Sequence, residues 1–183
     1  MLKTNAYIVF AAIFLLSFVG AAPADANQES LKARGGQVSC GGNNFLRLGG
    51  TEHQTTLWVL HNFDPTEPII INEWKVFNAT GAIIYDSAVS GLPASNNGLI
   101  GPANNTLNPH QTASFDSDVF LDFLDQNVRP IQLVVAWSSA RRAFPLNVGG
   151  AIRARERNPA TGAIGAERMR SGIACESILR DRD

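Results

Sequence analysis

Hydrophobic and polar positions alternate with a period of two along most of the chain, a pattern typical of β-strands that bury one face. The clearest runs are rich in β-branched and aromatic residues and are bounded by residues that favour turns. Strands are therefore expected over residues 55–63, 69–77, 82–85, 111–115, 131–138, 148–157 and 163–175. The most apolar run, IQLVVAWS at 131–138, is expected to be a central strand.

Turn and loop signals separate these strands. Two prolines in DPTEP (64–68) forbid a continuous ladder, while 78–81 and 158–162 each offer a glycine for a positive φ and predict hairpins. Residues 116–126 carry apolar positions at helical spacing and predict one or two helical turns. The loop from Ser87 to Thr106 is long and rich in Gly, Pro and Asn, which is typical of a binding element or a cover.

Strand-rich patterning with hardly a helix predicts an all-β protein. We expect an antiparallel β-sandwich of seven to nine strands that forms a single domain over residues 37–183. The polar stretch 27–36 is expected to be a loose N-terminal arm. Tryptophan occurs in three different strands, and these side chains are expected to share the core between the sheets; they are Trp58, Trp74 and Trp137.

Composition narrows the class of protein further. Of the 183 residues, 45% are hydrophobic and 17% are charged, and the formal net charge is −1. These values exclude a disordered chain, a collagen-like repeat and a polytopic membrane protein. Without an excess of basic residues, nucleic acid is not an expected partner.

The first 26 residues have the three parts of a secretory signal peptide. Lys3 precedes an apolar run at 6–19, and the small-residue site Ala24-Asp25-Ala26 follows it. The run is shorter than the roughly 20 apolar residues of a membrane-spanning helix. We therefore expect cleavage after Ala26, no stable membrane insertion afterwards, and a secreted or periplasmic mature chain.

Export makes the two cysteines informative. Cys40 lies near the start of the mature chain and Cys175 near its end, and the sequence holds no other cysteine. An even number of cysteines in an oxidising compartment predicts one disulfide between them.

Parts of the chain resemble known sandwich domains. The run TTLWVLHNFDPTEPIIINEWKVFNATGAIIYDS, together with IQLVVAWS and the arginine-bearing hairpin after it, resembles immunoglobulin-like modules of exported bacterial proteins. More loosely, TEHQTTLWVLHNFD and NVRPIQLVVAWSSARR are similar to the sandwich of sensory rhodopsin transducers, small domains linked to ligand binding or signalling. The resemblance implies an immunoglobulin-like sandwich and assigns a role to no residue.

Catalytic signatures are missing from the sequence. It contains no GxSxG motif and no Gly-rich phosphate loop. His53 and His61 are too far apart along one strand to share a metal, and His110 follows a proline in an expected turn. Four aspartates cluster in sequence and are expected to cap turns, although a glycosidase-type carboxylate pair stays open; they are Asp116, Asp118, Asp122 and Asp125. We assign no catalytic residue, no metal site and no cofactor.

Arginines gather in the C-terminal part of the chain. From residue 141 onward there are nine arginines against five acidic residues. Arg153, Arg155 and Arg157 alternate along one expected strand, so they should share a face, with Arg168 and Arg170 alongside on the partner strand. Because guanidinium groups suit carboxylate, phosphate or sulfate, these five arginines are the candidate anion-binding site, an exposed face. The competing interpretation is a face neutralised by the nearby aspartates.

Three hypotheses for function follow. The leading one is an exported, non-catalytic module that mediates interaction with a protein or an anionic surface. The second is a small-ligand or anion-binding protein that uses the arginine-bearing hairpin. The third is a hydrolase whose carboxylates converge only in space.

Overall fold

The computed structural model describes residues 34–118, 131–140 and 145–180. All of them belong to one compact unit, Leu31–Asp183. The predicted signal peptide, 1–26, lies outside the described residues. Within the described residues the structure has eleven strands, all paired antiparallel, in two sheets that pack face to face.

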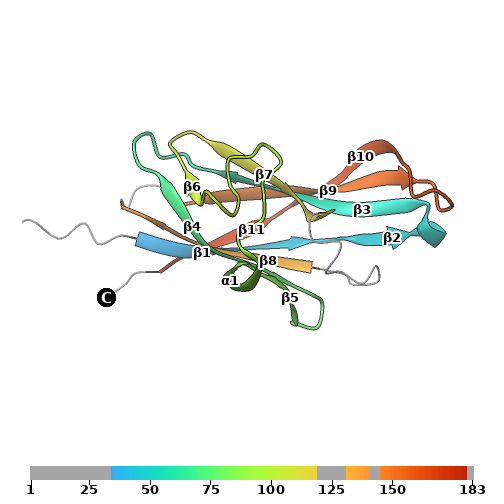
Figure 1. The fold of residues 1–183 in the computed structure, drawn as a ribbon, viewed down its shortest axis with the longest axis horizontal. Helices are drawn as coiled ribbons and strands as arrows, with labels where there is room; N and C mark the ends of the chain where they lie inside the picture. Colours follow the sequence, from blue (N-terminus) through green and yellow to red (C-terminus); the bar gives the residue numbers. More distant parts are fainter. Residues whose placement is uncertain (1–33, 119–130, 141–144, 181–183) are drawn as a thin grey trace, which may run out of the picture. The chain divides into compact units, whose positions relative to one another are not determined.

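Sheet A contains six strands in the order β11-β1-β8-β4-β5, with β6 also paired to β4. Sheet B contains five, in the order β10-β9-β3-β2, with β7 also paired to β3 (Figure 1). The strands of sheet A are β1 Arg34–Gly42, β4 Ile69–Phe77, β5 Ile83–Asp86, β6 Thr106–Leu107, β8 Ile131–Ser139 and β11 Cys175–Arg180. Those of sheet B are β2 Phe45–Arg47, β3 Glu52–His61, β7 Thr112–Asp116, β9 Asn147–Arg157 and β10 Ile164–Ile173. The short helical elements of the described residues include a 3-10 turn at Leu48–Gly50 and the helix α1 at Ser87–Ser90.

The expected all-β sandwich is confirmed, and β8 is central in sheet A as predicted. Eleven strands exceed the expected seven to nine, because several segments form separate short strands and two long segments are each divided between the sheets. The predicted loose arm is wrong at its last three residues, since β1 begins at Arg34. The sequence RGGQVSCGG lacks apolar alternation, yet it pairs with both β8 and β11. A Cβ at Gly35 would lie 2.7 Å from the carbonyl oxygen of Trp137, so glycine permits this close pairing.

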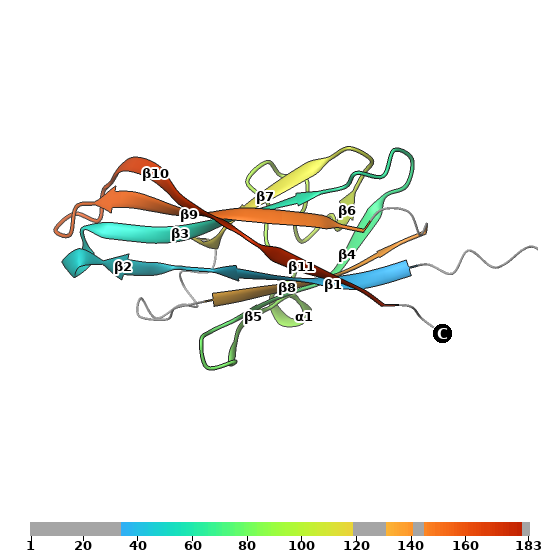
Figure 2. The same cartoon turned by 180° about the vertical axis from the view of Figure 1, so that it is seen from behind.

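Two segments pass from one sheet to the other. β1 in sheet A continues into β2 in sheet B, and β10 in sheet B continues into β11 in sheet A (Figure 2). The disulfide lies near both crossings: Cys40 and Cys175 are register partners of β1 and β11, with Cα atoms 4.3 Å apart. The predicted pairing is confirmed. It joins positions 135 residues apart at the point where the two sheets exchange strands.

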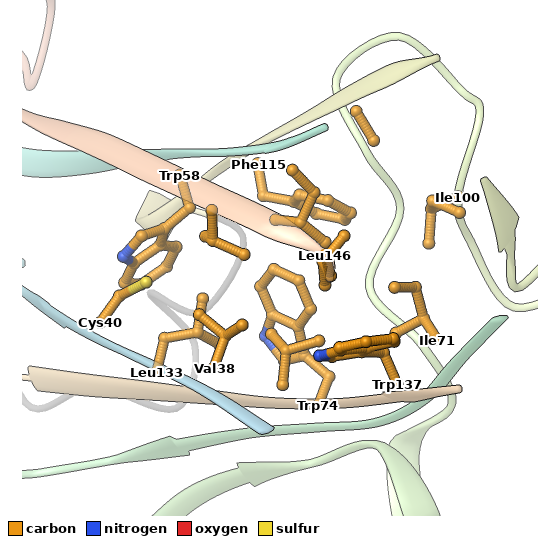
Figure 3. Packing of buried hydrophobic residues seen from close by; sticks show 14 of the residues in the cluster. Val38, Cys40, Trp58, Ile71, Trp74, Ile100, Phe115, Leu133, Trp137 and Leu146 are labelled. Carbon is orange, nitrogen blue, oxygen red and sulfur yellow. The ribbon is translucent and has the colours of Figure 1, made fainter. Parts of the chain in front are cut away.

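Aromatic side chains fill the space between the sheets. Trp58 from β3 meets Trp74 from β4 edge to face at a centroid distance of 6.3 Å, and Trp74 lies 4.4 Å from Phe115 of β7 (Figure 3). Trp137 of β8 belongs to the same buried cluster, which confirms the expected shared tryptophan core. Side chains of this size dominate the apolar area that a core buries. They therefore hold the two sheets together and fix where the surface groups of each sheet lie.

Both predicted hairpins form. Asn78 and Asn158 each accept backbone hydrogen bonds through their side-chain oxygens, and the glycines that close the turns, Gly81 and Gly162, have φ of 83° and 73°. Only glycine adopts such φ values readily. The second hairpin joins β9 to β10 and carries the arginines of the candidate site. Of the predicted helical segment 116–126, Asp116 ends β7, Ser117 and Asp118 lie in a 3-10 turn, and residues 119–126 lie outside the described residues.

Candidate anion-binding surface on the second sheet

The ends of β2, β3, β9 and β10 continue beyond the strands of sheet A (Figures 1 and 2). Paired residues on neighbouring antiparallel strands share a face, so the register assigns each arginine to one side of sheet B. Arg153 and Arg155 lie opposite Thr55 and His53 of β3. Trp58 is on the other face of β3. Toward the C-terminal end of β3 this inner face packs against sheet A in the core.

The five arginines do not share one face, which corrects the sequence-based expectation. In β10, Glu167 lies opposite Arg155, and Arg168 lies opposite Ala154. A register shift between Ile164 and Glu167 moves the pairing by one residue compared with a regular hairpin. Because side chains alternate with a period of two, this shift turns Arg168 to the side opposite Arg155. The arginines therefore form two groups.

The first group lies on the outer face of sheet B and is neutralised by acids. Arg155 donates to Glu167 with an Nε to Oε2 distance of 2.6 Å and also contacts Asp118; Arg153 contacts Asp116 and Glu167. The two guanidinium side chains are only 14% and 16% exposed. The expectation of an exposed arginine face is wrong for these residues, because Asp116 at the end of β7 and Asp118 just after it contact the two guanidinium groups. We call Arg153, Arg155, Asp116, Asp118 and Glu167 the outer ion-pair group.

The outer ion-pair group contains two of the four clustered aspartates, Asp116 and Asp118. Hydrogen bonds from Arg155 hold the pKa of Glu167 below its ordinary value. Asp116 and Asp118 are likewise paired with guanidinium groups, Asp116 with that of Arg153 and Asp118 with that of Arg155. The remaining aspartates of the cluster, Asp122 and Asp125, lie outside the described residues. Arg157, the third arginine of β9, lies 3.4 Å from the carbonyl oxygen of Gly50.

The second group surrounds one carboxylate on the inner face of sheet B. Arg170 Nη2 lies 2.5 Å from Glu52 Oε2, Arg168 Nη2 lies 3.4 Å from the same oxygen, and Arg47 Nη1 lies 3.7 Å from Oε1. Glu52 is 5% exposed, whereas the arginines are 43%, 62% and 41% exposed for Arg47, Arg168 and Arg170. Three cations around one carboxylate leave a local surplus of two positive charges. We call these four residues the Glu52 cluster.

Hydrogen bonding keeps Glu52 ionised. Gln54 Nε2 donates to Glu52 Oε1 at 2.9 Å, and this bond, followed by those from Arg170 and Arg168, holds the pKa of Glu52 below its ordinary value although burial opposes the shift. The sequence pattern indicated neither Glu52 nor Arg47 as a site residue. Neither lay in a predicted strand, and no sequence signal indicates that β2 brings Arg47 beside Glu52.

A cluster of buried polar side chains, called here the polar junction, lies between β3 and the link that joins β1 to β2. His53 Nε2 lies 2.8 Å from Asn44 Oδ1, and Asn44 Nδ2 donates to the carbonyl oxygen of Ser117. Since the amide nitrogen of Asn44 is already a donor there, its oxygen must accept, so His53 carries a proton on Nε2. Burial lowers the pKa of His53. Thr56 and Ser117 complete the junction, with the Thr56 backbone N–H donating to Ser117 Oγ at 2.8 Å.

The other two histidines are at the positions expected for them. His61 ends β3, contacts Thr112 and lies against the ring of Phe63 at a tilt of 52°, and His110 lies in a turn with φ of 60°. His53 and His61 are eight positions apart on one strand. Within the described ranges, no group of three or more His, Cys, Asp and Glu residues is placed to hold a metal ion.

These pKa shifts predict a two-stage loss of stability in acid. When folding lowers the pKa of a group, that group stabilises the folded state at pH values above its unfolded-state pKa. The contribution is lost as the pH falls below that value toward the folded-state pKa. We expect the free energy of unfolding to fall first below pH 6.5, the ordinary value of His53, and again below pH 4.5, the ordinary value of Glu52 and Glu167. Urea unfolding at a series of pH values, followed by tryptophan fluorescence, measures both stages.

His53→Gln is the control for the first stage. Glutamine retains a donor for Asn44 and does not titrate, so the decline that begins near pH 6.5 should disappear while the decline below pH 4.5 remains. An unchanged profile in this variant contradicts the assignment to His53.

Comparison of the chain with protein-family models, curated proteins and solved structures finds no significant match. The class of protein rests on the geometry alone: a two-sheet β-sandwich with a disulfide. In the described part of the chain no helix is long and apolar enough to cross a membrane.

Proposed function

We propose that this protein is an exported, non-catalytic β-sandwich module that binds an anionic group of a protein or surface partner through the Glu52 cluster. The observation that carries the proposal is the convergence of Arg47, Arg168 and Arg170 on one carboxylate. Each guanidinium offers five N–H donors, and Glu52 already accepts a bond from Gln54. Most donors of the cluster are therefore left for solvent or for a ligand.

The geometry of the three side chains supports an anionic ligand. Glu52 is buried and forms ion pairs with the guanidinium groups, so their positions are restricted before a ligand binds. This restriction reduces the conformational entropy that the side chains lose on binding. A carboxylate, phosphate or sulfate group would accept the remaining N–H donors in pairs. The outer ion-pair group is not part of the proposal, because acids of the same chain already occupy those guanidinium groups.

Export rests on two features of the chain. The N-terminal pattern predicts a signal peptide, and the Cys40–Cys175 disulfide is a bond that persists in oxidising compartments. A secreted or periplasmic site of action is therefore part of the proposal, as is the resemblance to immunoglobulin-like modules. A partner outside the cytoplasm with sulfate, phosphate or carboxylate groups fits the charge of the cluster.

Binding of dextran sulfate to mature protein, residues 27–183, tests the proposal. We expect saturable binding at low salt that weakens as salt rises, since the contacts are charged and exposed. The double variant Arg168→Ala with Arg170→Ala should weaken it about tenfold or more, because each charged hydrogen bond contributes on the order of 1.5 kcal/mol. Fluorescence anisotropy of labelled dextran sulfate measures the affinity.

Lys75→Ala is the matched control for removal of a positive charge. Lys75 is on sheet A, where it pairs with Glu73 and Asp86, so its loss should leave the affinity for dextran sulfate nearly unchanged. Neutral dextran should not bind through the cluster. If the double arginine variant binds dextran sulfate as tightly as the natural protein does, the Glu52 cluster is not the anion site.

A further inference from the structure

Strand β4 contains a bulge on the sheet opposite to the Glu52 cluster. In the register with β8, Ile71 lies opposite Trp137 and Glu73 lies opposite Ala136, so Asn72 is an extra residue. Ile71 and Trp74 on either side are buried in the core. The bulge therefore turns two consecutive polar side chains, Asn72 and Glu73, away from the core on the same side of the strand.

Among the described residues, no strand covers the edge of β4 beside the bulge. β6 pairs with β4 at Ile69–Ile70 and β5 pairs with it at Lys75–Phe77. Between them the predicted long loop supplies two single contacts: the N–H of Ile71 donates to the carbonyl oxygen of Asn105 at 2.8 Å, and that of Trp74 donates to Ser87 Oγ at 2.8 Å. The loop thus provides hydrogen-bond acceptors for the backbone N–H groups of the core-facing residues Ile71 and Trp74. It leaves a space at the bulge between them.

This space is a pocket with a volume of about 430 Å³. Such a volume lies within the range of small-molecule sites, roughly 300–1,000 Å³. The polar side chains on its wall come from the bulge and from both ends of the loop, namely Asn72, Glu73, Ser87, Asn104 and Asn105. The apolar part of the wall is formed chiefly by Leu92, Pro102 and Ala103.

The pocket offers both hydrogen-bond donors and acceptors, and Glu73 is the charged side chain on its wall. Lys75 contacts Glu73 and also Asp86, so it offsets the charge of Glu73 only in part. Ser87 Oγ accepts from Trp74, so its hydroxyl hydrogen remains to be donated. Asn104, by contrast, is held by the loop, because its amide donates to Leu99 and accepts from Thr106. Asn72 Oδ1 accepts a bond of 3.4 Å from Ser138 Oγ, and Asn105 Oδ1 accepts one of 3.4 Å from Thr106 Oγ1. The groups left for a ligand are thus the Nδ2 donors of these two amides, the Ser87 hydroxyl and the Glu73 carboxylate.

We propose that the pocket beside the β4 bulge binds a neutral, hydroxyl-rich small molecule of the sugar class. Vicinal hydroxyls donate and accept at once, which matches an amide, a hydroxyl and a carboxylate side by side, and the Leu92–Pro102–Ala103 wall suits the C–H face of a sugar ring. An anionic ligand is disfavoured by Glu73. The site belongs to sheet A and is independent of the Glu52 cluster.

Saturation-transfer difference NMR on mature protein tests this site with glucose, galactose, mannose and N-acetylglucosamine as probes. At least one probe should give saturable transfer. Asn72→Ala should weaken its binding about fivefold, the equivalent of one hydrogen bond of about 1 kcal/mol. Ala88→Leu, which places a larger side chain on the pocket wall, should abolish the signal without removing any side-chain hydrogen bond.

Asn96→Ala is the matched control, because Asn96 belongs to the same loop and makes its contact with Asp116 outside the pocket. Its signal should equal that of the natural protein. Absence of transfer for all four sugars, or a signal that Ala88→Leu leaves intact, overturns the proposal. Binding that is lost in the Arg168→Ala with Arg170→Ala variant instead also overturns it, since that result places the sugar on the other sheet.

Discussion

Replacing both cysteines, as Cys40→Ala with Cys175→Ala, is expected to lower the free energy of unfolding by about 3–4 kcal/mol. The disulfide closes a loop across 135 residues, for which the chain-entropy model sets an upper figure of about 5 kcal/mol. Both residues also lie where β1 and β11 pair, close to the points at which the strands change sheets. Without the bond, the pairing of the C-terminal strand depends on backbone hydrogen bonds and local packing alone.

Urea unfolding monitored by the fluorescence of the buried tryptophans measures this effect. Reduction of the natural protein is the control, because it breaks the same bond while retaining both sulfur atoms. The reduced natural protein and the double variant should lose similar stability, with any excess in the variant due to the side-chain volume lost at buried Cys40. A double variant as stable as the oxidised natural protein contradicts this role of the disulfide.

Arg155→Met is expected to lower the free energy of unfolding by about 2–3 kcal/mol. The value lies between about 3–5 kcal/mol for breaking a buried ion pair and about 0–1 kcal/mol for an exposed one, since the Arg155 side chain is 16% exposed. Its removal leaves Asp116, Asp118 and Glu167 with one cation, Arg153, in a partly buried place. Repulsion among the carboxylates and their loss of hydrogen bonds account for the cost.

Arg157→Met is the matched control for this prediction. It makes the same substitution two residues along the same strand and on the same face, at an arginine whose side chain lies 3.4 Å from a single backbone carbonyl. The control should stay within about 0.5 kcal/mol of the natural protein. Equal stability losses in the two variants would show that the outer ion-pair group has no special role.

Much of the sandwich could be predicted because apolar alternation reports directly on burial. Residues 69–77 form β4 with the predicted bounds, and the two hairpins form where asparagine and glycine favour turns. β1 was missed for a physical reason: its glycines allow close pairing on both edges but carry no apolar signal. β2 was missed as well, since a strand of three residues is too short to show a period.

The arginine-bearing hairpin shows most clearly what local pattern does not contain. The sequence by itself determined that Arg153 and Arg155 share a face, because alternation is a property of one strand. Whether Arg168 and Arg170 join them depended on the register between β9 and β10, and a shift of one residue moved them to the other side. Which acids meet which arginines was decided by contacts over long sequence separations, Asp118 with Arg155 on one face and Glu52 with Arg170 on the other. The sequence alone thus determined most of the longer strands, the two hairpins and the disulfide. The division of the arginines into a neutralised group and a group with surplus charge required the tertiary structure, since strand register and sheet crossing are properties of the whole fold.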